Sequence, residues 1–380
     1  MLDSGRVIEF LRERGLVDHS TAAGLDWRVR VVARRNRNLR VEGPGGGGFL
    51  LKQLHVPPGP GDPGLSHEAA FHRFCQEEPA VAGLSAFIPR LLHHEAGGDH
   101  LVFGLVPGAV PLGSSARTFE AAGWSVALGR ALATLHTTFR RLGPERDPRL
   151  SWLERGTPWV MRAHQPSPEI LGDLSPAGTR VLQILQADDR LCRTLEGLRV
   201  LWRAETVVHG DVKFDNVLVP SPPETGEVGV EANADAEPRV WLVDWEMVQL
   251  GDPAWDLAGA LHQFLVYWTR SMPLSSGVEA GQMIARARLP LAGLRPSIHA
   301  LWHGYRRASR LDPGEADDLL DRALTFSGAW LIHSACEFSS GAERLSPMSV
   351  ILLQLGANVL KDPGLARVHL YGIPPGGLPR

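Results

Sequence analysis

Apolar and polar positions follow helical and strand-like periods in turn over the first part of the chain. Residues 6–15 place apolar side chains at helical spacing with charged residues opposite them, which predicts a short helix. Residues 27–31, 39–42 and 49–54 are short runs of alternating or clustered apolar residues, and they predict three strands of a meander. Residues 65–75 return to helical spacing.

Two further apolar runs, 87–93 and 100–106, complete a predicted small antiparallel sheet. An acidic stretch with Pro near both ends, 221–238, is expected to be a mobile surface excursion. Helical patterns cover 124–136, 179–201, 254–269, 283–288, 298–309, 313–341 and 347–360. The predicted fold class is therefore α+β, with a small sheet-containing lobe at 1–106 and a larger, mostly helical lobe at 107–380.

A cluster of polar residues lies among short β-branched runs in the middle of the chain. The runs at 207–208, 217–219 and 240–243 predict buried strands. The polar residues that follow them are therefore expected at strand ends and in a tight loop, where a rigid scaffold commonly holds chemical groups. These residues are His209, Asp211, Lys213, Asn216 and Asp244.

Four of these side chains suit one reaction. A carboxylate such as Asp211 can accept a proton from a hydroxyl group. The oxygens of Asn216 and Asp244 are hard ligands that suit Mg²⁺, and the Lys213 ammonium suits phosphate oxygens. The spacing H-x-D-x-K-x-x-N, with a later Asp at a strand end, is that of kinases. An ordinary turn rich in Asp and Asn is the alternative, and it suffices for Asp215 alone.

Composition excludes several other classes of protein. The net charge of −3 indicates neither a nucleic-acid partner nor a membrane-surface partner. The cysteines Cys75, Cys192 and Cys336 are far apart, so they predict reduced thiols rather than a zinc site or disulfide framework. The start of the chain lacks the apolar segment of a signal peptide, and no apolar run is long enough for a transmembrane helix. We therefore expect a cytoplasmic protein.

Lysine is scarce in this chain. Arg carries nearly all of the positive charge, and the lysines are Lys52, Lys213 and Lys361. Because an ammonium group is more compact than a guanidinium, a lysine in such a chain is a candidate for a position near crowded phosphates.

The motifs HGDxxxxN, DWE and GDPxxDLA together resemble the aminoglycoside phosphotransferase-like superfamily of kinases. The resemblance implies a bilobal, protein-kinase-like fold that uses ATP and Mg²⁺. It implies that Asp211 is the catalytic base and that Asn216 and Asp244 hold the metal. The aspartates of the third motif, Asp252 and Asp256, would brace the site.

The same resemblance assigns nucleotide-binding residues to the small lobe. Lys52 on the third strand would bind the α- and β-phosphates and pair with Glu68, in a helix that Ser66 could cap. Phe103 would lie at the back of the purine pocket, with the Gly104 carbonyl and the Val106 amide as contacts to the base. The turn between the first two strands lacks glycine and is basic. Its arginines either clamp phosphate or are solvated; they are Arg34, Arg35 and Arg37.

The acceptor hydroxyl is less clearly indicated. The N-terminal run, with its Arg-Asn-rich turn at 33–38 and the Lys-Gln pair at 52–53, is similar to the kinase component of class V lanthipeptide and thioamitide biosynthesis. Lys213 agrees with a peptide hydroxyl as the acceptor. That resemblance implies phosphorylation of Ser or Thr in a ribosomal precursor peptide, with a separate lyase as a further partner. Two alternatives stay open: a kinase of an aminoglycoside, choline, homoserine or a sugar, and an inactive kinase-like scaffold that binds a peptide.

Overall fold

The structure is a computed structural model, and two compact units can be distinguished in it. It describes residues 2–17, 27–33, 37–43, 46–54, 65–94, 100–114, 122–172, 174–221, 238–274 and 279–374. Arg35 and nearly all of the insert predicted to be mobile lie outside the described residues. The first unit comprises Met1–Ser114 and Asp215–Val248, and the second comprises Ser115–Phe214 and Gln249–Arg380.

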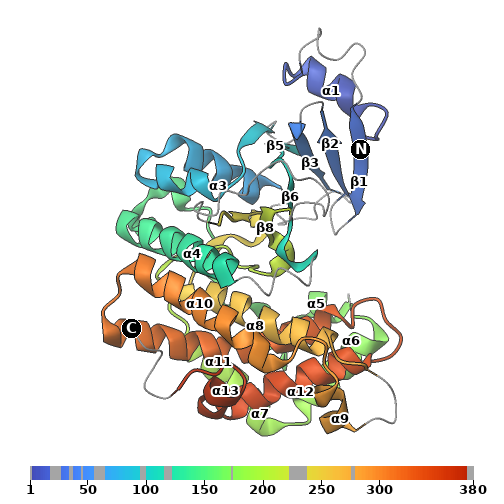
Figure 1. Ribbon diagram of the computed structural model, residues 1–380, viewed down its shortest axis with the longest axis vertical. Coiled ribbons are helices and arrows are strands. Elements are labelled where there is room, and N and C mark those ends of the chain that lie inside the picture. Colours follow the sequence, from blue (N-terminus) through green and yellow to red (C-terminus); the bar gives the residue numbers. More distant parts are fainter. Residues whose placement is uncertain are drawn as a thin grey trace, which may run out of the picture. The chain divides into compact units, whose positions relative to one another are not determined.

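The first unit is built on a five-stranded antiparallel sheet with the strand order β1-β2-β3-β5-β4 (Figure 1). Its strands are β1 (Arg28–Ala33), β2 (Arg37–Glu42), β3 (Gly48–Gln53), β4 (Leu91–His94) and β5 (His100–Gly104). The helices of this unit are α1 (Val7–Glu13) and α3 (Ser66–Glu77), with a 3₁₀ segment at Pro79–Ala86. The meander and the strand–helix order predicted from the sequence are therefore present.

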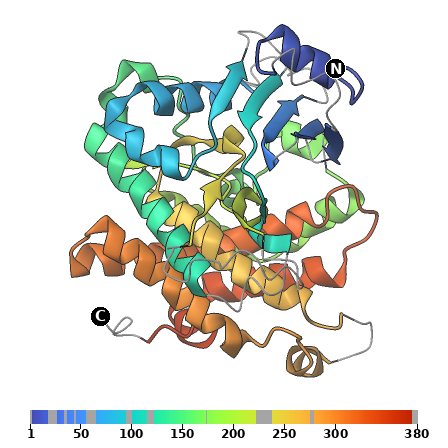
Figure 2. The same ribbon diagram turned by 45° about the horizontal axis from the view of Figure 1, so that its top comes forward.

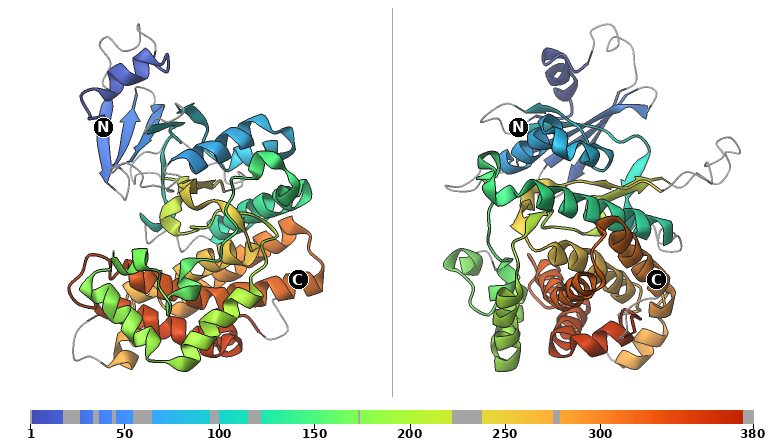
Figure 3. Two further views of the ribbon diagram at one scale, coloured as in Figure 1. Left: turned by 180° about the vertical axis from the view of Figure 1, so that it is seen from behind. Right: turned by 90° about the vertical axis from the view of Figure 1, so that its left-hand side faces the viewer.

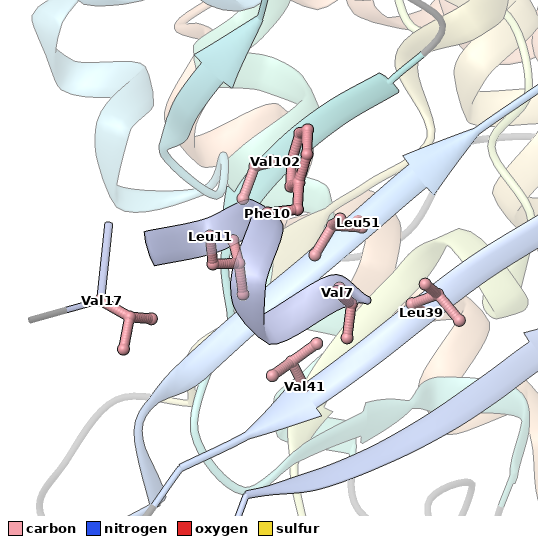
Figure 4. Close-up of a cluster of buried hydrophobic side chains, with 8 residues drawn as sticks. All are labelled: Val7, Phe10, Leu11, Val17, Leu39, Val41, Leu51 and Val102. Carbon is pink, nitrogen blue, oxygen red and sulfur yellow. The ribbon is translucent and has the colours of Figure 1, made fainter. Parts of the chain in front are cut away.

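Alternation along the strands separates two faces of this sheet. Figure 4 shows side chains of α1 directed toward apolar side chains of β2, β3 and β5. Leu51 belongs to this helix-covered face, so its neighbours Leu50 and Lys52 lie on the opposite face. The buried cluster comprises Val7, Phe10, Leu11, Val17, Leu39, Val41, Leu51 and Val102. Burial of the helix thus fixes the face on which Lys52 is presented.

The first unit also contains a second, smaller sheet. This sheet explains why the unit includes residues far beyond position 106, where the sequence predicted the boundary between the two lobes. Strand β8 (Val217–Pro220) pairs with β6 (Ala109–Pro111) and with β9 (Trp241–Leu242), all antiparallel. Because β6 precedes residue 115, this pairing groups residues 215–248 with the first unit.

The second unit is mainly helical, and its helices can be followed from green to red in Figures 2 and 3. They are α4 (Ala122–Leu142), α5 (Pro168–Gly172), α6 (Pro176–Gln186), α7 (Asp189–Leu201), α8 (Pro253–Arg270), α9 (Ala280–Ala285), α10 (Leu291–Ser309), α11 (Pro313–Glu337), α12 (Pro347–Lys361) and α13 (Pro363–His369). A short antiparallel pair joins β7 (Thr206–Val208) to β10 (Gln249–Gly251). Helix α11 packs on α8 and α12, and α4 packs on α10. No helix among the described residues could cross a membrane.

Two local expectations were wrong, and one helix was not predicted as a separate element. The helix predicted over 179–201 is two helices, because the Asp188 side chain accepts hydrogen bonds from Arg190 N and Leu191 N and starts α7. Ser66 is the first residue of α3 and makes no capping hydrogen bond. Helix α13 was not expected; it follows α12 at once, with the Asp362 side chain as its cap.

Candidate functional site

Lys52 lies among three carboxylates in the first unit. Its Nζ is 2.6 Å from Glu68 Oε2 on α3, forms a hydrogen bond with Asp244 Oδ1, and is 3.4 Å from Glu246 Oε2. The residues Lys52 and Glu68 are only 4% and 1% exposed. Burial alone would lower the pKa of the Lys52 ammonium, but the three carboxylates outweigh burial and raise its pKa above the usual value. Lys52 is therefore a fixed, buried positive charge.

The segment Asp244–Glu246 is held against α3 by a ring stack and by a hydrogen bond. Asp244 has a left-handed backbone conformation with φ of 69°, which few residues other than Gly adopt and which Asp tolerates. The fully buried Trp245 stacks on Phe71 of α3 with ring centroids 4.2 Å apart. The Trp245 N–H also donates to Glu68 Oε1 over 3.2 Å. The same glutamate thus holds both Lys52 and the turn that directs Asp244.

Glu246 was not recognised from the sequence as a site residue. Its Oε2 lies 3.4 Å from Lys52 Nζ. The only signal available was its place in the DWE motif, because an acidic residue after a strand end is common in turns.

Asn216 and Asp244 fit the metal-binding roles that the sequence predicts for them. Val243 N donates to Asn216 O over 3.0 Å, which continues the β8–β9 pairing and places the two side-chain positions on adjacent segments. Among the described residues, no group of three or more His, Cys, Asp or Glu is arranged as a complete metal cage. Mg²⁺ in kinases is commonly held by one or two protein oxygens together with phosphates and water, so a pair of this kind suffices.

A largely apolar cavity lies next to Lys52, and all of its lining belongs to the first unit. The predicted residues Lys52, Glu68, Phe103, Gly104 and Val106 all line it. The full lining is Val32, Asn38, Arg40, Leu50, Lys52, Glu68, His72, Pro89, Phe103, Gly104, Leu105, Val106, Ala109, Pro111, Asp215, Leu218, Val243 and Asp244. Lys52 on the cavity wall suits the phosphates of a nucleotide, and the apolar side chains of the lining suit its base.

Two of the backbone N–H groups that follow Phe103 donate hydrogen bonds to other residues of the first unit. Gly104 N donates to Arg90 O, and Leu105 N donates to Gly48 O, each over 2.9 Å. Within the described residues, the Val106 N–H makes no hydrogen bond inside the chain. It is therefore available to a ligand, as the predicted contact with the base requires.

The predicted base and its lysine lie together in the second unit. Lys213 Nζ is 2.8 Å from Asp211 Oδ2 and 3.7 Å from Glu337 Oε1 at the end of α11. The other Glu337 oxygen is 3.7 Å from His333 Nδ1. The sequence alone does not reveal that Glu337 lies near Lys213, because this nearness depends on where α11 ends.

Asp256 holds the backbone that leads to Asp211. One of its carboxylate oxygens accepts from His209 N over 2.8 Å and the other from Gly210 N over 3.0 Å. His136 Nε2 lies 3.0 Å from the same carboxylate, and His136 Nδ1 lies 2.9 Å from Tyr305 Oη. The buried His136 thus has a hydrogen-bonding role, and Asp256 braces the loop.

Asp252 is the centre of a second buried network. Its carboxylate accepts from Ala254 N at the start of α8, from Arg203 N, and twice from the Arg322 guanidinium. Arg322 also pairs with Asp318, which in turn binds Arg203. Asp318, an acidic residue of α11, therefore belongs to this network.

The loop that carries Asp211 packs closely against α8. A Cβ on Gly259 would lie 2.7 Å from Val212 O, so only glycine allows the loop to approach the helix this closely. Gln263 Oε1 accepts from Phe214 N, and Gln263 Nε2 lies 3.0 Å from the buried His262. Burial lowers the pKa of His262 to about 3, and the nearby Lys213 ammonium acts in the same direction.

The comparisons with known proteins place the chain in a family. Residues 28–294 match the model of the phosphotransferase enzyme family (APH). The chain belongs to this family. The matched segment contains Lys52, Glu68, Asp211, Asn216 and Asp244, whereas Glu337 lies beyond it. No curated protein matches the chain.

Solved structures of phosphotransferases share this fold. A choline kinase from Cryptosporidium parvum Iowa II aligns with a TM-score of 0.55 and 11% identity, covering 95% of this chain and 97% of that chain. The GDP complex of a variant aminoglycoside 2′-phosphotransferase IIIa aligns with a TM-score of 0.50 and 12% identity, covering 97% and 99%. The predicted fold class, that of protein-kinase-like phosphotransferases, is confirmed.

Proposed function

We propose that the chain transfers the γ-phosphoryl group of ATP to a hydroxyl group. The observation that carries this proposal is the buried Lys52, held by Glu68 and Asp244 beside a largely apolar cavity. Lys52 would bind the α- and β-phosphates, and the base would lie against Phe103 and the Gly104–Val106 backbone. Mg²⁺, when bound by Asn216 and Asp244, would neutralise charge on the phosphates.

Asp211 would act as the base. The acceptor oxygen forms a bond to the γ-phosphorus while the bond from this phosphorus to the β–γ bridging oxygen breaks, and ADP leaves. The hydroxyl proton passes to the Asp211 carboxylate. Lys213, 2.8 Å from that carboxylate, would neutralise charge on the phosphoryl group in transfer.

For the acceptor we propose Ser or Thr of a precursor peptide in ribosomal peptide biosynthesis, with a separate lyase as a further partner. The Asp211–Lys213 contact supports this proposal, because a lysine two residues after the base is a feature of protein-kinase catalytic loops. A small-molecule hydroxyl is the second candidate. The Glu337 carboxylate close to Lys213 favours it, since a second carboxylate there could bind a cationic group on the acceptor.

Mass spectrometry tests the proposal and separates its two acceptors. The protein would be incubated with ATP and Mg²⁺ and with either Ser/Thr-containing precursor peptides or hydroxylated small molecules that include aminoglycosides and choline. The expected result is the gain of one phosphoryl group on a peptide, which is lost with Asp211→Asn. A gain on small molecules alone would overturn the peptide acceptor and leave phosphoryl transfer in place. Nucleotide binding with no transfer to either pool would favour the inactive scaffold.

A further inference from the structure

The wall of the nucleotide cavity contains an arginine that the proposed reaction does not use. Arg40 on β2 lines the cavity with Leu50 and Phe103, and its side chain is 29% exposed. We propose that the Arg40 guanidinium lies over the flat face of the nucleotide base and binds it by stacking. This inference rests on the proposed function, because it assumes that the cavity takes a nucleotide.

Strand register places Arg40 at the base end of the cavity. Arg40 pairs with Leu50, and Leu50 pairs with Phe103, so the three side chains form one row across β2, β3 and β5. Lys52 belongs to the next row on the same face, together with Asn38. Two residues along a strand span about 6.6 Å. The Arg40 row is therefore the one nearer to the backbone after Phe103.

The orientation of the side chain agrees with this position. Arg40 Nε donates to Glu42 Oε1 over 2.7 Å. Because Glu42 lies on the side of Arg40 opposite to Asn38 along β2, this hydrogen bond directs the guanidinium away from the row that contains Lys52. Glu42 pairs with Gly48, whose carbonyl accepts from Leu105 N. The guanidinium is thus held beside the segment that offers the Val106 N–H to a ligand. This direction favours contact with the base over contact with phosphates.

Apolar residues of the smaller sheet provide a second surface for the base. Leu218 of β8 and Val243, just after β9, line the same cavity as Arg40 and Leu50. A planar base between these surfaces would meet aliphatic carbon on one face and the guanidinium on the other. Guanidinium groups stack on aromatic faces through dispersion and cation–π attraction. Such stacking does not read the edge of the base, so we expect it to strengthen ATP and GTP binding alike.

The sheet itself gains little from an arginine at this position. Arg30 of β1 lies directly opposite Arg40, and like charges directly opposite each other destabilise a strand pair. Arg30 is exposed and is absent from the cavity lining. The pair therefore supplies a matched control, because both arginines share a row and a charge while only Arg40 faces the cavity.

Calorimetric titration of the full chain with Mg·ATP, Mg·GTP and inorganic tripolyphosphate tests the inference. Arg40→Ala is expected to weaken ATP and GTP binding about tenfold and to leave tripolyphosphate binding unchanged. Arg30→Ala is expected to change none of the three. Arg40→Lys, which keeps the charge and loses the planar group, is expected to recover only a small part of the loss.

Two results would overturn the inference while leaving the proposed function intact. One is ATP affinity in Arg40→Ala equal to that of the wild type. The other is an equal loss for ATP and tripolyphosphate, which would assign Arg40 to the phosphates. Circular dichroism of each variant would establish that it is folded. A folded wild-type chain that binds no nucleotide would contradict the proposed function itself.

Discussion

At the scale of single residues, Lys52 is the charge around which the first unit's site is arranged. Glu68, Asp244 and Glu246 surround it, and Trp245 fixes the turn that holds two of them. Removing the ammonium would leave three carboxylates close together, so this cluster depends on Lys52 for its stability.

Asp211 offers the sharpest test of chemistry at one residue. Asp211→Asn keeps the size of the side chain and removes the proton acceptor, so kcat is expected to fall by about 10²–10⁴-fold while ATP affinity stays within about twofold. Steady-state kinetics and equilibrium binding would measure the two effects. Asp317→Asn, which changes an exposed carboxylate on α11, is the control and should leave both unchanged. Equal losses of turnover and ATP affinity in Asp211→Asn would indicate a structural role.

The spacing of residues in the sequence was enough to predict the site residues that belong to recognisable motifs. Lys52 and Glu68 could be paired because a strand and then a helix carry them in order, and the structure joins them over 2.6 Å. Glu246 and Glu337 could not be predicted in the same way. Their relevance depends on a backbone turn at Asp244 and on the last turn of α11, and neither leaves a periodic pattern.

At the scale of elements, the Asp211 loop depends on its contact with α8. Gly259→Ala would place a Cβ 2.7 Å from Val212 O, which the loop can accommodate only by moving. We expect a loss of roughly 1–3 kcal/mol in the free energy of unfolding, together with reduced kcat. Urea unfolding and steady-state kinetics would measure these changes.

Gly197→Ala on α7 is the matched control for this contact. A Cβ at Gly197 meets nothing within 4 Å, so alanine there should stabilise the helix by about 0.5–1 kcal/mol. If the two variants behave alike, the close contact between α8 and the loop does not matter for stability.

Elements with strong periodicity were predicted well, and their ends less well. The meander β1–β3 and the helices that begin with Pro313 and Pro347 follow directly from alternation and from helix-start signals. The break between α6 and α7 was missed because apolar spacing continues across it, while the Asp188 cap that causes it is a local polar feature.

At the scale of the whole molecule, two compact units contain different parts of the predicted site. The first contains the cavity beside Lys52, with Asp244, and the second contains Asp211 and its bracing network. The grouping of 215–248 with the first unit comes from long-range pairing of β8 with β6, which local patterns do not encode.

Stability toward acid should depend on His262 in the second unit. Its pKa is lowered from 6.5 to about 3 by burial, so the unfolded chain takes up a proton at a higher pH than the folded chain does. The stability contributed by neutral His262 is therefore complete above pH 6.5 and is lost as the pH falls toward 3.

Urea unfolding at about pH 7 and about pH 5 would measure this contribution. The wild type is expected to lose more stability between these conditions than His262→Gln, which cannot take up the proton. An equal loss in both proteins would show that His262 does not contribute to acid sensitivity, since the carboxylates that also titrate are common to both.

We propose that the first unit's cavity binds a magnesium nucleotide through Lys52. Calorimetric titration of the wild type and of Lys52→Met with Mg·ATP would test this claim, with circular dichroism to establish that both proteins are folded. We expect saturable binding at one site in the wild type that requires Mg²⁺ and becomes at least about tenfold weaker in Lys52→Met. A folded wild type that binds no Mg·ATP, or a folded Lys52→Met that binds it equally well, would contradict the claim.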